Sequence, residues 1–110
     1  MKEDKIILEM HADLCKAFAH PTRLWILNAL RDKEMTVTDM TQALGVAKGN
    51  LAQHLAILKQ RQIVGTRREG INVYYHVTDP KIIQACELMR SVLLNQLKET
   101  EKLSRKYATG

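Results

Sequence analysis

Five basic side chains and no acidic one lie between residues 47 and 68: Lys48, Lys59, Arg61, Arg67 and Arg68. The whole chain carries 17 basic and 12 acidic residues, so its net charge of +5 equals the charge of this one segment. Clustered basic side chains neutralise phosphates and provide salt-dependent affinity for a duplex. The segment is therefore a candidate surface for double-stranded DNA, and a solvated helix face is the alternative interpretation.

Polar side chains at the start of the same segment have the chemistry needed to read bases. Asn50 and Gln53 carry amides, which pair with adenine edges through two hydrogen bonds. Lys48 favours guanine or phosphate, and we expect His54 to lie near a phosphate or a base. These four residues are candidate DNA contacts.

Two cysteines, Cys15 and Cys86, form a second candidate site. As small buried apolar residues they would need no further function. As a thiol switch they would form a disulfide or polysulfide bridge that changes how the subunits of a dimer are arranged. As ligands of a soft metal or metalloid ion they would be joined by His11, four residues before Cys15 on the same helical face. The residues alone leave all three interpretations open.

The sequence does not favour catalysis. The only two serines, Ser91 and Ser104, have no histidine near them in sequence, and the scattered glycines form no phosphate-binding loop. A pair of His11 and Cys15 is geometrically possible, but a helix face buried in an interface offers no substrate site. We therefore expect a binding protein and not an enzyme.

Composition bounds the remaining classes. One Phe, one Trp and three Tyr are too few for the stacking platform of a single-stranded nucleic acid binder. With 45% apolar and 26% charged residues, the chain has the proportions of a single globular domain over residues 1–110. We see neither a signal-peptide pattern nor an apolar run of membrane-spanning length, so we expect a cytoplasmic protein with no membrane partner.

The periodicity of apolar residues indicates the elements that position these groups. It predicts helices over residues 5–18, 22–30 and 47–62, and a capping box at 36–39 opens another helix that ends at Gly45. Strands are predicted over 63–68 and 72–77, joined by a turn at 69–71, and a last helix runs from 79 to about 106. The predicted fold is mainly α with a small β-hairpin, in the order α-α-α-α-β-β-α. The short connection after Gly45 makes residues 36–62 a helix-turn-helix, with residues 63–77 as its wing.

The predicted first and last helices carry more apolar surface than the middle of the chain can cover. Their apolar positions recur at helical spacing: Ile6, Ile7, Met10 and Leu14 in the first, and Met89, Val92, Leu93 and Leu97 in the last. A spare apolar stripe is best explained by a second copy of the chain. We therefore predict a homodimer that assembles through residues 1–20 and 79–106, and a fold-back of the two helices within one chain is the alternative.

Several segments together resemble the arsenic-repressor type (ArsR) of winged-helix regulators. They are Leu14–Leu27 (LCKAFAHPTRLWIL), Leu44–Val46 (LGV), His54–Leu58 (HLAIL), and Arg67–Gly70 (RREG) followed by Val73–Tyr75 (VYY). The resemblance spans roughly residues 10–97 in the right order. It implies a homodimeric repressor that binds a palindromic DNA operator and is released by a ligand or an oxidant. It also implies that the helix from Ala47 reads the major groove and that the hairpin at 67–72 contacts the DNA backbone or minor groove.

The residues and the resemblance together define the predicted DNA contacts. These are Lys48, Asn50, Gln53, His54, Lys59, Arg67, Arg68 and Asn72. One departure from the family concerns Ala47, which stands where a serine usually caps the reading helix. Such a missing cap costs about 0.5–2 kcal/mol, so we expect the start of this helix to become firmer on DNA.

The family's usual metal patterns are absent from this sequence. No cysteine occurs around Thr38–Thr41, no histidine occurs in Asp79–Lys98, and Asn28 lies near where persulfide sensors have their first cysteine. We therefore favour a thiol-based signal at Cys15 and Cys86 over a metal or metalloid ion, and we predict no resident cofactor. A winged helix that contacts only other proteins is a further alternative, and it would show no salt-dependent duplex binding.

Overall fold

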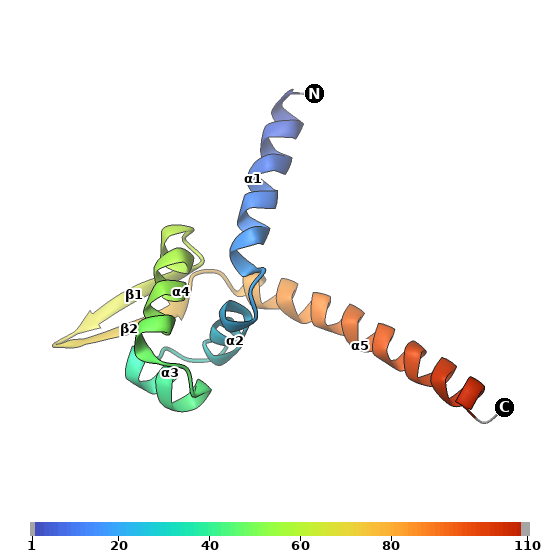
Figure 1. Ribbon diagram of the computed structural model, residues 1–110. Helices are drawn as coiled ribbons and strands as arrows, with labels where there is room; N and C mark the ends of the chain where they lie inside the picture. Colours follow the sequence, from blue (N-terminus) through green and yellow to red (C-terminus); the bar gives the residue numbers. More distant parts are fainter. Residues whose placement is uncertain (1, 109–110) are drawn as a thin grey trace.

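The computed structural model describes residues 2–108, which form five helices and one β-hairpin (Figure 1). The elements are α1 (Lys2–Phe18), α2 (Pro21–Ala29), α3 (Val37–Leu44), α4 (Lys48–Gln60), β1 (Val64–Glu69), β2 (Asn72–Val77) and α5 (Pro80–Ala108). Their order confirms the predicted winged helix-turn-helix. Within residues 2–108, no helix has both the length and the apolar character that crossing a membrane requires.

Local capping groups set the starts of α2 and α3. Pro21 occupies the first turn of α2, and Nδ1 of His20 accepts a hydrogen bond of 3.1 Å from the backbone N–H of Thr22. At α3 the Thr36 hydroxyl accepts from the backbone N–H of Asp39 at 3.1 Å, and the Asp39 carboxylate accepts from the Thr36 N–H at 3.0 Å. The predicted capping box is therefore confirmed.

The turn into α4 and the end of α4 depend on left-handed backbone conformations. Gly45 closes α3 with a φ of 67°, which glycine adopts without steric cost. Ala47 precedes α4 and makes no side-chain cap, because its methyl group has no hydrogen-bond acceptor. The sequence predicted that α4 would reach Gln62, but the helix ends at Gln60 because Gln62 has a φ of 61° that turns the chain toward β1.

The hairpin is short and is fastened to the helix-turn-helix by its second strand. β1 and β2 pair antiparallel in a register that leaves a two-residue turn, Gly70–Ile71, with a φ of 61° at Gly70. Met35, just before α3, bridges β2: its N–H donates to the Tyr75 carbonyl at 3.1 Å, and the Tyr75 N–H donates to the Met35 carbonyl at 2.8 Å. The bridge was not predicted, and it fixes the wing relative to α3.

We call α2, α3, α4, the hairpin and the first turns of α5 the body of the protein. A single core lies inside the body, between α2, α3, α4 and the start of β1. Its buried residues are Ala17, Ile26, Leu27, Leu30, Met35, Met40, Leu44, Leu51, Leu55, Leu58, Ile63 and Val64. Trp25 is 51% exposed and lies outside this core. It lies about 100° around α2 from the buried Ile26, on the side of the helix away from Leu27 and Leu30.

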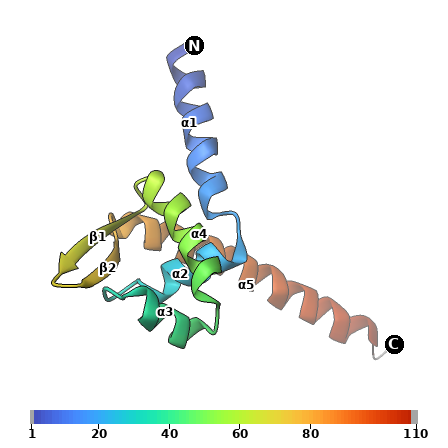
Figure 2. The ribbon, with the colours of Figure 1, turned by 60° about the vertical axis from the view of Figure 1, so that its left-hand side comes forward.

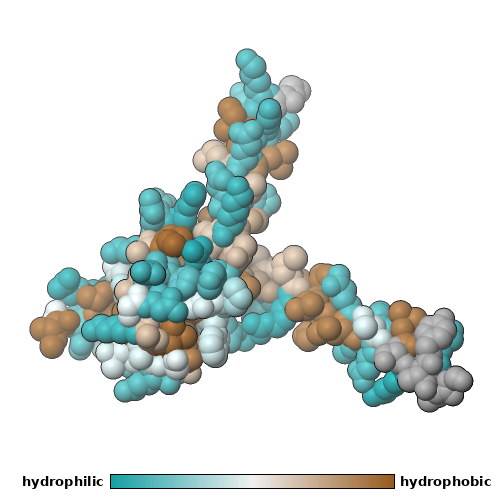
Figure 3. All heavy atoms as spheres, in the orientation of Figure 1, coloured by the Kyte–Doolittle hydropathy of each residue, from teal (hydrophilic) through white to brown (hydrophobic). Residues whose placement is uncertain are grey.

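The two terminal helices leave the body as divergent arms, namely α1 and the part of α5 beyond Cys86 (Figures 1 and 2). Among the residues of α1, Ala17 is the one buried side chain, and the apolar stripes of both arms are exposed. Figure 3 shows these stripes as hydrophobic patches along each arm. The radius of gyration of 17.8 Å reflects this shape, because a compact chain of this length has a value of about 13 Å.

Candidate nucleic-acid interface

Helix α4 presents the predicted base-reading side chains to solvent. Its leucines at 51, 55 and 58 are buried in the core, so the opposite side of the helix faces outward. Asn50 and Gln53 are exposed on that outward side, and Lys48 and Lys59 are exposed at its flank. The sequence-based prediction for these four residues therefore meets its first geometric requirement, which is access to a ligand.

Small residues separate the polar side chains on the exposed side of α4, and the sequence analysis did not assign them a role. Gly49, Ala52 and Ala56 are all exposed, and their spacing of three and four residues places them along one line of the helix. Without long side chains there, the backbone of α4 can approach another surface closely. Their spacing relative to the buried leucines was the signal that could have identified them.

A groove of about 530 Å³ lies between the start of α3, the start of α4 and the hairpin. It brings together Lys48 and Asn72, two predicted contacts that are far apart in sequence. Thr36 and Thr38 line the same groove and were not predicted, although hydroxyls at a helix start are common partners of DNA phosphates. The groove joins the helix-turn-helix and the wing into one polar surface.

The tip of the hairpin carries an apolar side chain that the sequence analysis also did not assign. Ile71 is 94% exposed in the two-residue turn and borders the groove. Figure 3 shows hydrophobic atoms at this tip, where the hairpin extends beyond the body. An apolar side chain at the end of a basic hairpin is suited to contact with sugars or base edges in a minor groove.

The two wing arginines differ in their surroundings. Nε of Arg67 lies 3.1 Å from a carboxylate oxygen of Glu34, and its Nη1 lies 2.9 Å from Glu69. Its guanidinium also lies 4.8 Å from the centroid of the Tyr74 ring. Hydrogen bonds to Glu69 and then Glu34 are the main causes that raise the pKa of Arg67. Within residues 2–108, Arg68 forms no ion pair and is exposed.

The side chain of His54 points toward α2 and the connection that precedes it. Its Nδ1 accepts a hydrogen bond of 3.1 Å from Nε of Arg23 on α2, and its ring lies 4.4 Å from that of His20. Burial, followed by the charges of His20 and Arg23, lowers the pKa of His54. The structure therefore separates His54 from Lys48, Asn50 and Gln53, with which the sequence analysis had grouped it.

The cysteines lie at the bases of the two arms. Cys15 is exposed on α1, whereas Cys86 is half-buried on α5, where burial is the main cause that raises its thiol pKa. The helices α1 and α5 both pack against α2. Across residues 2–108, no three His, Cys, Asp or Glu side chains are grouped so as to hold a metal ion, so His11, Cys15 and Cys86 form no such group within one chain.

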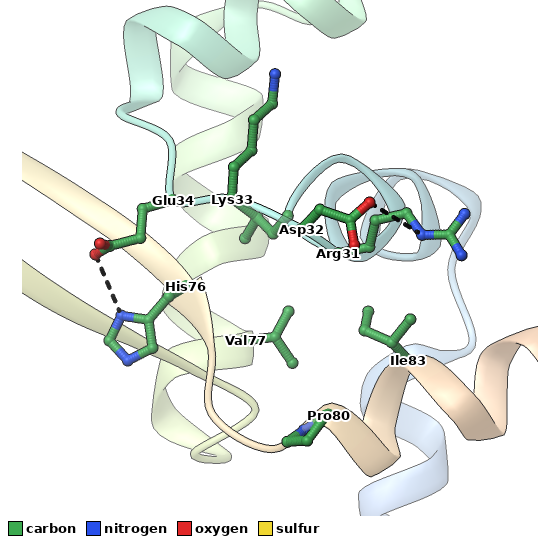
Figure 4. A pocket seen from close by; sticks show the side chains of 9 residues that line it. Arg31, Asp32, Lys33, Glu34, His76, Val77, Pro80 and Ile83 are labelled. Carbon is green, nitrogen blue, oxygen red and sulfur yellow. Dashed lines mark ion pairs between the residues drawn. The ribbon is translucent and has the colours of Figure 1, made fainter.

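A second hollow, of about 280 Å³, lies between the α2–α3 connection, the end of β2 and the start of α5. Figure 4 shows that its charged groups pair with each other, since Arg31 meets Asp32 and His76 meets Glu34. Lys33 points away from the hollow (Figure 4). These side chains do not converge on a common point, and the hollow has no ligand-binding arrangement.

Comparisons with known proteins place this architecture in context. A family model described as "Bacterial regulatory protein, arsR family" matches residues 20–65. The chain is 31% identical over 88 residues to the biofilm growth-associated repressor of Xylella fastidiosa strain Temecula1, covering 80% of this chain and 77% of that one.

Two solved structures share the fold over most of the chain. One is the homodimeric winged helix-turn-helix DNA-binding domain of Mb0332 from Mycobacterium bovis, a possible ArsR-family transcriptional regulator. It has a TM-score of 0.80 at 27% identity and covers 90% of this chain and 92% of that one. The other is reduced HlyU from Vibrio cholerae, with a TM-score of 0.74 at 30% identity over 84% of this chain and 97% of that one.

Proposed function

The chain belongs to the arsR family of bacterial regulatory proteins, and from that premise we propose that it is a homodimeric repressor of a palindromic DNA operator, released by a thiol-reactive signal. The family consists of transcriptional regulators, in agreement with the expectation that the chain is not an enzyme. The observation that carries the proposal is the exposed side of α4, where basic and amide side chains continue across the groove into the wing.

The proposed DNA contacts follow the exposure of these side chains. In the major groove we place Asn50 and Gln53 on base edges, with Lys48 and Lys59 on the flanking phosphates or guanines. The small residues along α4 support this placement because they let the helix enter the groove deeply. Arg68 and Asn72 are the wing contacts with DNA backbone or minor groove.

Arg67 and His54 were also predicted as DNA contacts, but their surroundings in the structure indicate a smaller contribution to DNA binding. Two carboxylates already neutralise Arg67, so a phosphate would have to compete with them for the guanidinium. The imidazole of His54 accepts from Arg23 inside the chain. We assign His54 a role in positioning α4, and we treat Arg67 as a weaker phosphate contact than Arg68.

The proposed homodimer rests on the arms. Their exposed apolar stripes make up a surface that a chain of this size does not leave in water without a partner. A second copy offers the same stripes, so a two-fold interface would cover both at once. A dimer would also relate two α4 helices by a two-fold axis, which is the symmetry of a palindromic operator.

The proposed signal acts on Cys15 and Cys86 at the bases of the arms. The Cys15 thiolate attacks an external disulfide or polysulfide and expels its first sulfur fragment; Cys86 then attacks the mixed disulfide and expels the second. The external reagent accepts two electrons, and the two cysteines lose two protons. Cys15 reacts first because it is exposed, whereas burial raises the pKa of Cys86 and keeps it as the less reactive thiol.

DNA binding is tested with the reduced full-length protein and a random-sequence duplex library. Selected sequences should contain an inverted repeat with half-site centres about 10 base pairs apart. Affinity for a selected duplex, measured by fluorescence anisotropy, should fall steeply with salt. A protein that binds no duplex at any salt concentration would instead be a module for protein contacts, and the proposal would be wrong.

The signal is tested on the selected duplex with polysulfide, oxidised glutathione or peroxide. Each reagent should weaken binding by the wild type but leave Cys15→Ser and Cys86→Ser unchanged. Zn²⁺ and arsenite are added to the reduced protein in parallel. If both serine variants respond like the wild type, the thiol mechanism is wrong; if only the metal ions release the DNA, the ligand interpretation with His11 takes its place.

A further inference from the structure

A small polar cluster lies where α1, α2 and α4 meet. Arg23 of α2 donates from Nε to Nδ1 of His54 on α4 at 3.1 Å, and from Nη1 to the Ala17 carbonyl of α1 at 3.3 Å. His20, in the connection between α1 and α2, packs its ring 4.4 Å from that of His54. One guanidinium therefore contacts both the arm and the proposed reading helix.

The two acceptors have specific reasons to need Arg23. The last carbonyls of a helix have no partner within the helix, and Ala17 is in the last turn of α1. His54 accepts through Nδ1, which requires the neutral ring with its proton on Nε2. Burial lowers the pKa of His54 and so favours that neutral form. Arginine suits this place because its planar fork donates in two directions, which a lysine ammonium on a flexible stem does not reproduce.

The arm has few other attachments to the body. Ala17 is the one buried residue among those of α1, and the helix packs on α2 and α4 at this end only (Figures 1 and 2). The angle between α1 and α4 therefore depends on the few contacts around Ala17, Arg23 and His54, which we call the joint. Cys15, the proposed sensing thiol, precedes Ala17 by two residues on the same helix.

We propose that Arg23 is a positioning residue that fixes the angle between arm α1 and helix α4, and thereby passes a change at the arm to the DNA-binding side. The regulatory part of this inference rests on the proposed function. In a dimer held through the arms, the separation of the two α4 helices follows from the α1–α4 angle of each protomer. Because operator half-sites have a fixed spacing, a change in this angle weakens binding without removing any DNA contact.

The joint itself is tested by a distance measurement that needs no DNA. Nitroxide labels are placed at Glu9→Cys on α1 and Gln60→Cys on α4 in a chain whose native cysteines are serines. Labelled chains are diluted with unlabelled protein so that pulsed electron paramagnetic resonance reports the distance between the two labels within one chain. The parent should give a narrow distribution, and Arg23→Lys and His54→Leu should both broaden it. His54→Gln, which keeps an acceptor, should stay narrow.

An Arg23→Lys distribution as narrow as that of the parent, in a variant that still melts cooperatively, would overturn the proposal. The same result for His54→Leu would show that the imidazole has no part in the joint. Failure of DNA binding leaves this measurement unaffected, so it separates an error in the joint from an error in the proposed function.

The regulatory consequence is tested on the selected duplex. Arg23→Lys should lose about 5- to 10-fold in affinity, which is the lower end of the usual coupling between two sites. Its salt slope should equal that of the wild type because no phosphate contact is removed. Combining Arg23→Lys with His54→Leu should weaken binding no further than either change alone. A lowered salt slope, or additive losses, would mean that both residues contact DNA directly, and the positioning role would be wrong.

Discussion

The body and the arms of this chain use the same kinds of apolar residue in opposite ways. Leu55 on α4 is 1% exposed, whereas Leu93 on α5 is 52% exposed, although both belong to regular helical stripes. In the body the stripes of three helices and a hairpin cover one another. In the arms each stripe has nothing to pack on within one chain. The body therefore contains what is needed to present α4, and the arms contain what is needed to join two bodies.

Truncating one leucine from each region gives the largest expected contrast. Leu55→Ala should lower the free energy of unfolding by about 2–5 kcal/mol, because the side chain leaves a cavity in a closed core. That loss should be the same at every protein concentration. Leu93→Ala should destabilise the protein mainly through assembly, so the difference between its thermal midpoint and that of the wild type should change with concentration. Both variants are denatured thermally across a hundredfold range of protein concentration. If they responded to concentration in the same way, the distinction between body and arms would be wrong.

Placing a charge on the arm should separate assembly from folding. Leu93→Glu should convert the dimer to monomers, because a carboxylate in an apolar interface loses its hydration without gaining a partner. Affinity for a palindromic duplex should then fall at least about 100-fold, since each body would bind its half-site alone. Asn95→Glu, on the opposite side of α5, is the matched control and should change neither property. Sedimentation velocity and anisotropy measure the two outcomes.

The wing allows DNA binding to be altered with the arms untouched. Arg68→Ala should reduce affinity for every duplex and lower the salt slope by about one, as expected for one lost phosphate contact. Arg67→Ala should have the smaller effect, because Glu34 and Glu69 already neutralise its guanidinium. Both variants should remain dimers. Equal effects of the two substitutions would show that the carboxylates release Arg67 when DNA binds.

The joint between body and arm should make stability depend on pH. Well above the ordinary histidine pKa of 6.5, His54 is neutral whether folded or unfolded, so its contribution is fully present. Below that value the unfolded chain takes up a proton that the folded chain resists, because burial, His20 and Arg23 lower the folded pKa. The thermal midpoint should therefore fall as the pH is lowered from above 6.5 to below it. His54→Gln should fall less over this range, and an identical fall would remove His54 as the cause.

The smallest expected change lies at the start of α4. Ala47 makes no side-chain cap, so Ala47→Ser should raise the free energy of unfolding by about 0.5–2 kcal/mol. A more ordered helix start should also be visible as slower amide exchange in the first turn of α4. Since the change is confined to the body, the dimer mass should not alter. Unchanged exchange would indicate that the helix start is already ordered.

Local signals made much of the fold predictable. The capping box at Thr36 and Asp39 and the glycine after α3 define their helix boundaries through neighbouring residues alone. The end of α4 was missed by two residues, because the φ of Gln62 depends on where the chain must go next. The Met35–Tyr75 bridge was missed because it joins segments forty residues apart.

The candidate site divides in the same way. The basic run of residues 47–68 and the amides on α4 could be recognised from residue type and spacing, and their side chains are exposed in the structure. The difference between Arg67 and Arg68 could not, because adjacent strand residues point to opposite sides and only the fold decides which side meets Glu34. The inward contact of His54 with Arg23 depends on the packing of α2 against α4 in the same way.

The sequence by itself determined which residues carry charge, amide and thiol groups, the order of the elements, and the apolar stripes of the terminal helices. These properties follow from residue type and periodicity, which act over a few neighbouring positions. Only the tertiary structure decided which arginine is neutralised, that Lys48 and Asn72 border one groove, and that Arg23 links α1 to α4. These are contacts between distant segments, and their geometry exists only once the core has set the elements in place.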